Sequence, residues 1–424
     1  MARISPKTDI LVLGVGFTGL LVTEALAKHR DRSKFTFAIA GRSQRKLDGI
    51  VGRPLLRGIK AYCVDVAKSD ELRRLVTGFR VVINCTSQYW KLAIPVVSAC
   101  IVAGTHYLDL AGELPFYFKS VALYWFDARG EHQTSASVVI HACGYESIPS
   151  DIVAFESVQK LRQRYGPDTR VSTSTTAMAL HKAFVSRGTV LSGISMLRDV
   201  PRDLFWKSLE PFRLSPIQGI PPRRMTLYDL KPHVALVGSF FLLSANNIAA
   251  VNRTWGLLQS IKSAAAYGEE FTYNEFLVAS SSNVARLTSI LSFFAAWMLI
   301  YIPPIRWLVE WLLDRESAKA TYKDLETGSL SATNITISAP SAHGSTPHCA
   351  KAVFKTIGGD GGYMGSAVSI TECALLLVLH DPSALPLNSF TTSRVLTPVA
   401  AFGSMLTKRL IDSGFYEITT EILQ

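Results

Sequence analysis

Two patterns of apolar residues alternate over the first 150 residues of the chain. Short continuous apolar runs are separated by stretches with helical spacing, such as GLLVTEALAKH (19–29) and IPVVSACIVAG (94–104). Continuous apolar runs are typical of strands buried on both faces of a parallel sheet. Strands that alternate with helices predict a doubly wound α/β domain. The six runs are DILVLG (9–14), FTFAIAG (35–41), IKAYCVDV (59–66), RVVINCT (80–86), THYLDLAG (105–112) and SVVIHACG (137–144).

The pattern changes after residue 150. TRVSTSTTAMAL (169–180) reads as a strand, and SLSATNITISA (329–339) and HCAKAVFKTIGG (348–359) alternate like antiparallel strands. We therefore predict an N-terminal α/β domain over residues 1–150 and a second, α+β domain with a mixed sheet over 151–370. This second domain would hold the substrate and a dimer contact. Residues 371–424 are predicted to form helices that pack back on the first domain.

Two segments of the second domain are unusually apolar. Residues 234–252 and 287–304 contain no charged side chain, and we expect apolar helices at 234–252 and 287–313. A membrane-spanning helix needs about 20 apolar residues, and the second uncharged segment ends in two prolines. Buried core or dimer contact, a helix in the membrane interface, and a true span all stay open. Four residues that follow the prolines share one helical face: Trp307, Leu308, Trp311 and Leu312.

Composition narrows the class of protein. The 424 residues are 48% hydrophobic and 18% charged, and the net charge of +11 comes from scattered Lys and Arg, so nucleic acid is not an expected partner. A basic chain suits anionic partners such as a phosphorylated cofactor, an acyl carrier or an anionic membrane surface. The widely spaced cysteines and the polar N-terminus predict an intracellular protein that is not secreted. It would be cytoplasmic or peripherally associated with a membrane or lipid droplet.

The segment GVGFTG (14–19) follows the first predicted strand and opens the first predicted helix. This context turns a GxGxxG pattern into a dinucleotide-binding fingerprint. Gly14 permits the tight turn, Gly16 lets backbone N–H groups approach a pyrophosphate, and Gly19 lets the helix pack closely on the sheet. Phe17 and Thr18 complete the loop. The motif predicts a Rossmann-type domain that binds a nicotinamide dinucleotide.

The end of the second predicted strand indicates which dinucleotide binds. NAD sites usually carry an acidic residue there, about 20 residues past the glycines, whereas this strand ends in Arg42 and Ser43. A guanidinium at this place can bind a 2′-phosphate, which favours NADP(H). Asp65 follows the third strand and is a further candidate contact, although it could equally cap the next helix. Asn84, Cys85 and Thr86 end the fourth strand and complete the predicted cofactor contacts.

Catalytic candidates are weaker because no constellation is visible. A reductase needs a proton donor opposite the atom that receives hydride. Tyr89, Glu113 and Tyr145 lie just past predicted strand ends, and Tyr89 is the first choice. Glu113 could instead cap a turn. His141 is expected to be a hydrogen-bonded core histidine, and no metal site is predicted.

Several collinear segments resemble one known family. GFTG, AGRSQRKL, VVINCTSQYW, VVSACIVAGTHYLDLAGE, HACGYESIPSD, RGTVLSG, YGEEFTYNEF and LTPVAAFG occur in the order found in saccharopine dehydrogenase-like oxidoreductases, including the trans-acting enoyl reductases of polyketide synthesis. The resemblance runs from Asp9 to about Gly414 and is strongest over residues 10–155. It implies a Rossmann domain, a nicotinamide cofactor and a second domain that holds the substrate.

The chain departs from that family beside the expected nicotinamide pocket. Ser87–Gln88 replaces the usual Gly-Pro before the tyrosine, and Glu146 replaces an aspartate. The resemblance implies an NADP(H)-dependent reduction of a C=C bond in a hydrophobic or carrier-bound acyl substrate, such as a polyketide, lipid or terpenoid. Three alternatives stay open. They are a C=N or C=O reductase of saccharopine type, a non-redox cyclase or isomerase of secondary metabolism, and a lipid-associated binding protein with a vestigial Rossmann fold.

Overall fold

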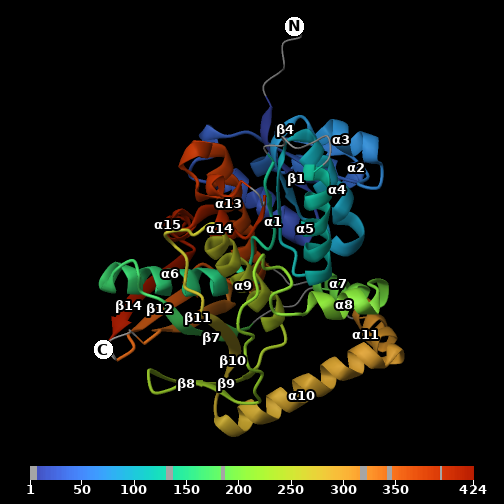
Figure 1. Ribbon diagram of the computed structural model, residues 1–424. Coiled ribbons are helices and arrows are strands. Elements are labelled where there is room, and N and C mark those ends of the chain that lie inside the picture. The colour runs from blue at the N-terminus through green and yellow to red at the C-terminus, as the bar shows by residue number, and fades with distance from the viewer. Residues whose placement is uncertain (1–6, 130–136, 183–186, 316–321, 341–345, 392–393) are drawn as a thin grey trace. The chain divides into compact units, whose positions relative to one another are not determined.

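The computed structural model describes residues 7–129, 137–182, 187–315, 322–340, 346–391 and 394–424 (Figure 1). The chain divides into two compact units. The first comprises residues 1–144 and 363–406, and the second comprises 145–362 and 407–424. The C-terminal part of the chain thus contributes to both units.

The first unit is built on a seven-stranded parallel sheet with the order β13-β6-β5-β4-β1-β2-β3. Its central strands are apolar on both faces, because Ile10, Leu11, Val12 and Leu13 are all buried. The order reverses between β1 and β4, and this reversal is where doubly wound sheets bind their ligands. The strands are β1 (Thr8–Leu13), β2 (Phe37–Gly41), β3 (Lys60–Cys63), β4 (Phe79–Asn84), β5 (His106–Asp109), β6 (Val139–Ile140) and β13 (Val395–Leu396).

Helices connect these strands as the alternating pattern predicted. The helices are α1 (Phe17–Lys28), α2 (Gln44–Val51), α3 (Ser69–Val76), α4 (Tyr89–Ala103), α5 (Leu114–Arg129), α13 (Ser366–Leu379) and α14 (Pro398–Phe402), with 3₁₀ turns at Arg32–Lys34, Pro54–Leu56, Pro382–Ala384 and Pro386–Ser389. Helix α13 is apolar and mostly buried, and it packs against α1 and β4. Its apolar sequence is therefore that of a core helix.

The second unit is built on a seven-stranded mixed sheet with the order β14-β12-β11-β7-β10-β9-β8. Only β7 and β10 pair in parallel among the described pairs. The two sheets confirm the predicted fold class, a Rossmann-type domain and an α+β domain. The strands are β7 (Val171–His181), β8 (Tyr228–Leu230), β9 (Val234–Phe240), β10 (Thr272–Ala279), β11 (Ser329–Ser338), β12 (Cys349–Thr356) and β14 (Tyr416–Leu423).

Helix α6 packs on β7, β11, β12 and β14, and α9 packs on β10. The helices of this unit are α6 (Ile148–Tyr165), α7 (Arg187–Asp199), α8 (Arg202–Ser208), α9 (Ser244–Ser260), α10 (Ser282–Tyr301), α11 (Pro303–Arg315) and α12 (Tyr322–Glu326). A π-turn at Gly361–Gly365 and helix α15 (Ser404–Asp412) lie where the chain passes between the units.

Three segments differ from the sequence-based expectation. Residues 234–240 form strand β9 and not the start of an apolar helix, because an apolar run this short packs equally well in a sheet. Residues 416–423 form β14, an edge strand of the second sheet paired with β12, and not a helix on the first domain. The expected apolar helix at 287–313 is two helices, α10 and α11, with the break at Ile302 and Pro303.

Candidate functional site

The glycine loop between β1 and α1 has three glycines with three separate structural roles. Gly14 has a φ of +93°, and a Cβ there would lie 2.8 Å from the backbone nitrogen of Thr86. A Cβ on Gly19 would lie 1.8 Å from the carbonyl oxygen of Gly14. A Cβ on Gly16, by contrast, would meet no atom within 4 Å. The fold itself requires Gly14 and Gly19, whereas the open space above Gly16 is what an approaching ligand needs.

The N-terminus of α1 has the chemistry of an anion site. Gly16 is its N-cap and provides no side chain to accept from the first N–H groups, and the first turn contains no acidic residue. These N–H groups and the helix dipole attract a phosphate. Phe17 is 41% exposed, and its ring packs edge-on against Tyr363 at 5.2 Å between centroids. Thr18 is half-buried in the first turn.

The end of β4 lies against this loop. The N–H of Cys85 donates to the carbonyl oxygen of Leu13 at 2.7 Å, which joins the ends of β1 and β4. The buried Asn84 side chain accepts from both the N–H and the hydroxyl of Thr86, at 3.1 and 2.8 Å. Its amide donates to the Tyr107 hydroxyl at 2.9 Å. Asn84 therefore shapes the turn that faces Gly14, while Cys85 and Thr86 supply the backbone there.

Arg42 and Ser43 lie where β2 ends, and both side chains are exposed. Ser43 caps α2 by accepting from the N–H of Lys46. Asp65 is exposed after β3 and accepts from the N–H of Ala67, so it forms a turn, while the N-cap of α3 is Lys68. Arg42 is thus available for an anion at the strand edge next to the glycine loop, because β2 pairs directly with β1.

Glu113 and Tyr89 meet at the start of α4. The N-cap Gln88 has a φ of +57° and makes no side-chain cap bond. The Glu113 carboxylate takes over that role by accepting from the N–H groups of Tyr89 and Trp90, at 3.0 and 2.7 Å. The Tyr89 hydroxyl donates to the carbonyl oxygen of Asn84 at 3.2 Å. Burial raises the pKa of Tyr89 well above its usual value, so its hydroxyl stays protonated.

His141 is a core histidine, as expected. It is fully buried, with Nδ1 2.7 Å from Asp109 and Nε2 2.8 Å from the Ser120 hydroxyl. Asp109 also accepts from the N–H groups of Ala111 and Ala142. The resulting network holds the ends of β5 and β6 together. Sequence reasoning missed Asp109 and Ser120 as partners because they come from separate elements.

Tyr145 opens the second unit, and its environment there is acidic. The residue is half-buried with its hydroxyl oxygen inside, and burial together with the charges of Glu275 and Glu146 raises the pKa of that hydroxyl. Glu275 on β10 lies in a buried network that accepts from Ser150, Asn247 and Tyr273, at 2.5, 2.5 and 2.8 Å. Burial raises the pKa of Glu275 to about 7. Sequence reasoning gave no signal for this carboxyl, because its partners lie up to 125 residues away.

The chain is similar to proteins of known families. Residues 10–144 match the saccharopine dehydrogenase NADP binding domain. The chain is similar to the trans-acting enoyl reductases of Mycobacterium bovis and Mycobacterium ulcerans, with 26% identity and complete coverage of both chains in each case. A Mycobacterium tuberculosis protein is 28% identical over 436 residues, covering 98% of each chain. Its name also assigns it trans-acting enoyl reductase activity, without presenting that activity as established.

A solved structure, the apo saccharopine dehydrogenase (L-Glu forming) of Saccharomyces cerevisiae, overlaps 98% of this chain and all of its own. Its sequence identity is 14% and the TM-score is 0.46. The matches to the domain model and to the enoyl reductases confirm the resemblance predicted from the sequence motifs. The matched domain binds NADP in that family, and the protein is an NADP(H)-dependent oxidoreductase.

Proposed function

We propose that this NADP(H)-dependent oxidoreductase is a trans-acting enoyl reductase, which reduces an activated C=C bond in a hydrophobic substrate of a biosynthetic pathway. The observation that carries the proposal is the glycine loop. It has open space above Gly16, an uncapped α1 N-terminus and the exposed Arg42 on the neighbouring strand. The full-length similarity to proteins named trans-acting enoyl reductase supports the choice of bond.

Each cofactor contact follows from a property of the chain. The first N–H groups of α1 would hold the pyrophosphate, and Arg42 with Ser43 would hold the 2′-phosphate. Asp65 and the turn of Asn84, Cys85 and Thr86 would border the remaining groups. When bound, NADPH supplies the hydride that the β-carbon of the enoyl group receives.

We propose Tyr89 as the proton donor to the α-carbon. A tyrosine hydroxyl is protonated at neutral pH at its ordinary pKa, and burial raises the pKa of Tyr89 further. The hydroxyl donates to the carbonyl oxygen of Asn84 at 3.2 Å. Glu113 is a positioning residue in this scheme, since its carboxylate binds the two N–H groups that begin α4. Tyr145 is a second candidate donor with a hydroxyl that also stays protonated. Tyr89→Phe should lower kcat and leave NADPH affinity unchanged, and unchanged kcat would assign the proton to Tyr145 or water.

We propose a long-chain polyketide, lipid or terpenoid acyl group as the substrate, free or bound to a carrier. The basic net charge suits an acidic acyl carrier. Such a protein would work inside the cell, in secondary metabolism, and a homodimer is compatible with it.

The decisive experiment titrates the purified protein with NADPH and with NADH and follows nicotinamide fluorescence. Arg42→Ala should weaken NADPH at least tenfold and leave NADH nearly unchanged, because only NADPH carries the 2′-phosphate. Arg57→Ala is the matched control, since Arg57 is also exposed in the first unit but lies away from the strand end. Equal loss for both nucleotides would contradict the role given to Arg42.

Activity is then tested with an α,β-unsaturated long-chain acyl thioester and NADPH, following the loss of reduced nicotinamide. Turnover with this substrate, and none with an imine or a ketone of similar length, is the expected result. NADPH binding without enoyl turnover would contradict the proposed function and leave the oxidoreductase class intact.

A further inference from the structure

Ten large apolar side chains on α10 and α11 are exposed. Their exposed fractions lie between 46 and 65%. We call this set the apolar face: Leu287, Ile290, Leu291, Phe294, Trp297 and Tyr301 of α10, and Trp307, Leu308, Trp311 and Leu312 of α11. The spacing of three and four residues places each group along one side of its helix.

The other side of α10 is fixed to the second sheet. The Phe293 ring stacks on Phe240 of β9 with 4.3 Å between centroids. The buried Ser289 hydroxyl accepts from the N–H of Phe240 and donates to the carbonyl oxygen of Thr226, both at 2.8 Å. Helix α10 is long and apolar enough to cross a membrane, with only 11% of its apolar window buried. Its attachment to β9 of the second sheet leaves it no freedom to span, so it presents one face outward.

Helix α11 has its polar and apolar sides reversed relative to an ordinary surface helix. Two of its charged side chains contact the protein, since Arg306 donates to the carbonyl oxygen of Leu197 and Glu310 pairs with Arg198 at 3.1 Å. Trp307 and Trp311 are exposed instead. This arrangement is unfavourable in water and requires an apolar partner.

The area of the apolar face also indicates that this surface binds a partner. If each side chain exposes about 100 Å², roughly half of what a large aromatic residue buries, the face measures on the order of 1,000 Å². The largest apolar patch of a typical monomer is about 300–600 Å².

Charge selects among the possible partners. Exposed basic residues lie on the segments beside the two ends of α10, where Figure 1 shows β8–β9 at one end and α8 with α11 at the other. The same segments carry acidic residues as well, Asp229 at the first end and Asp203, Glu310 and Asp314 at the second. A second copy would bring two chains of net charge +11 together, whereas an anionic surface is attracted. The basic residues are Arg223, Arg224, Lys231, Arg286, Arg202 and Lys207.

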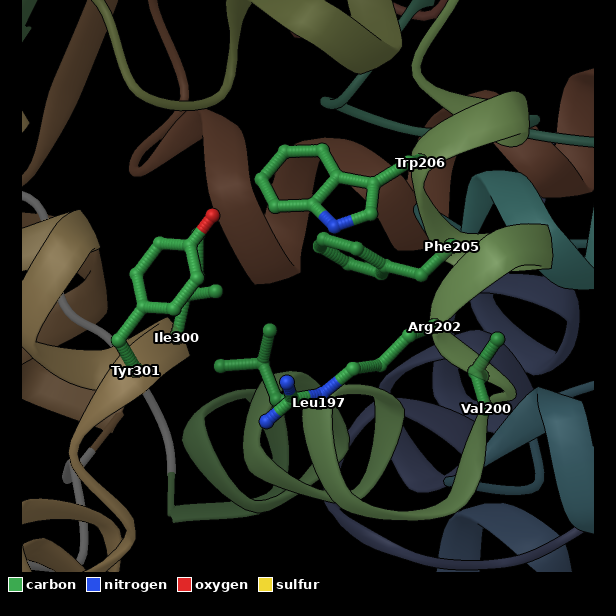
Figure 2. A pocket seen from close by; sticks show the side chains of 7 residues that line it. All are labelled: Leu197, Val200, Arg202, Phe205, Trp206, Ile300 and Tyr301. Atoms are coloured by element: carbon green, nitrogen blue, oxygen red, sulfur yellow. The ribbon is translucent and has the colours of Figure 1, made fainter.

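A pocket next to the apolar face is also lined by apolar and aromatic side chains with a basic residue beside them. Figure 2 shows Phe205 and Trp206 of α8 on one side and Ile300 and Tyr301 of α10 on the other, with Arg202 in the lining. Trp206 and Tyr301 are 45 and 48% exposed. Trp and Tyr with an adjacent cation are the residues that settle at the boundary between acyl chains and headgroups.

We propose that α10 and α11 bind the surface of an anionic lipid bilayer, with the apolar face among the acyl chains and the flanking arginines and lysines on the headgroups. The helices lie in the plane of the interface and do not cross the bilayer. This inference goes beyond the proposed function and is tested without substrate, so either can fail alone.

The test uses flotation of the full-length protein with vesicles of phosphatidylcholine, with and without phosphatidylserine. We expect binding to the anionic vesicles that weakens at least tenfold in neutral vesicles or at high salt. Trp307→Ser/Trp311→Ser should lower the binding at least tenfold. The matched control is Leu55→Ser/Ile357→Ser, which removes two apolar side chains exposed elsewhere and should bind as the natural chain does. NADPH titration of all variants verifies that the first unit is folded.

Two results would overturn the proposal. One is equal binding to neutral and anionic vesicles that Arg223→Glu/Arg224→Glu does not change, since the flanking cations would then have no role. The other is absence of vesicle binding together with a dimer, measured by analytical ultracentrifugation, that Trp307→Ser/Trp311→Ser dissociates. In that case the partner is a second copy of this chain.

Discussion

Both sheets have seven strands, but they differ in where their polar side chains lie. In the first sheet the strands are apolar on both faces, and the polar chemistry lies at the strand ends, at Gly16, Arg42 and Asn84. In the second sheet the face toward α6 and α9 contains a buried polar network beside apolar side chains such as Met178 and Phe354. Its buried side chains include Ser174, Thr176, Tyr273, Glu275, Asn334 and Thr336.

The opposite face of the second sheet carries a separate apolar cluster. Phe276 and Ile335 belong to a core cluster there, and Phe240 packs against it. Successive residues of a strand point to opposite faces, so Glu275 and Asn334 point inward where Phe276 and Ile335 point away. Helix α10 continues this outward apolar layer through Phe293. The first sheet thus has its candidate site in the turns after its strands, while the second sheet supports a helix whose exposed apolar residues face away from it.

Gly19→Ala should have the largest effect, because the first sheet depends on contacts of its backbone. The new Cβ would lie 1.8 Å from the Gly14 carbonyl oxygen, which is backbone and cannot move aside. We expect a loss of more than about 3 kcal/mol in the free energy of unfolding. Urea unfolding measures it, and Gly49→Ala is the control, since a Cβ on Gly49 in α2 meets nothing within 4 Å. A loss equal to that of the control would contradict the close packing of loop and helix.

Glu275→Gln tests the buried polar network of the second sheet. The pKa of Glu275 is raised from 4.5 to about 7 by burial. Between these values the folded protein holds a proton that the unfolded chain has lost, so stability falls as pH rises and is constant above about 7. The carboxyl therefore lowers stability by up to about 3 kcal/mol across this range. Gln cannot titrate, so the difference in unfolding free energy between the two proteins should change with pH. A difference that is flat from pH 4.5 to 8 would mean that Glu275 is charged in the folded protein.

Ser289→Ala tests the attachment of α10 to the second sheet. The substitution leaves the N–H of the partly buried Phe240 without its side-chain acceptor, the buried Ser289 hydroxyl. A buried unsatisfied donor costs about 1–2 kcal/mol, and thermal unfolding should report this loss. Ser292→Ala on the same helix is the control and should stay within about 0.5 kcal/mol of the natural chain. An effect no larger than the control would show that α10 does not depend on this bond.

The sequence predicted the parts of the fold that depend on neighbouring residues. The glycine loop and the β11–β12 pair follow from local spacing, and both appear where expected. Strand β9 was missed because a seven-residue apolar run fits a strand or a helix. Strand β14 was missed although Tyr416, Ile418 and Ile422 alternate with polar residues, because its pairing partner β12 lies far back in the chain.

The residues of the candidate site also divide into those that local sequence predicts and those that depend on distant parts of the chain. The roles of Gly14 and Gly19 could be predicted, since they follow from a strand, a turn and a helix in direct succession. The cap that Glu113 provides to α4 could not be predicted. The N-cap of α4, Gln88, makes no side-chain bond, and nothing in the sequence near Glu113 shows that this carboxylate replaces it. The sequence shows residues of the right type at strand ends. Only the fold shows which of these side chains already hydrogen-bond to backbone groups.

Gly16→Ala should change stability least and therefore separates ligand binding from folding. Its φ of −72° suits alanine, and the new Cβ meets no protein atom within 4 Å. The free energy of unfolding should stay within about 1 kcal/mol of the natural value. The methyl group nevertheless occupies the space that a pyrophosphate needs, so we expect NADPH affinity to fall at least tenfold in the fluorescence titration. Unchanged affinity would mean that the dinucleotide does not approach the backbone at Gly16. A large loss of stability would mean that all three glycines serve the fold alone.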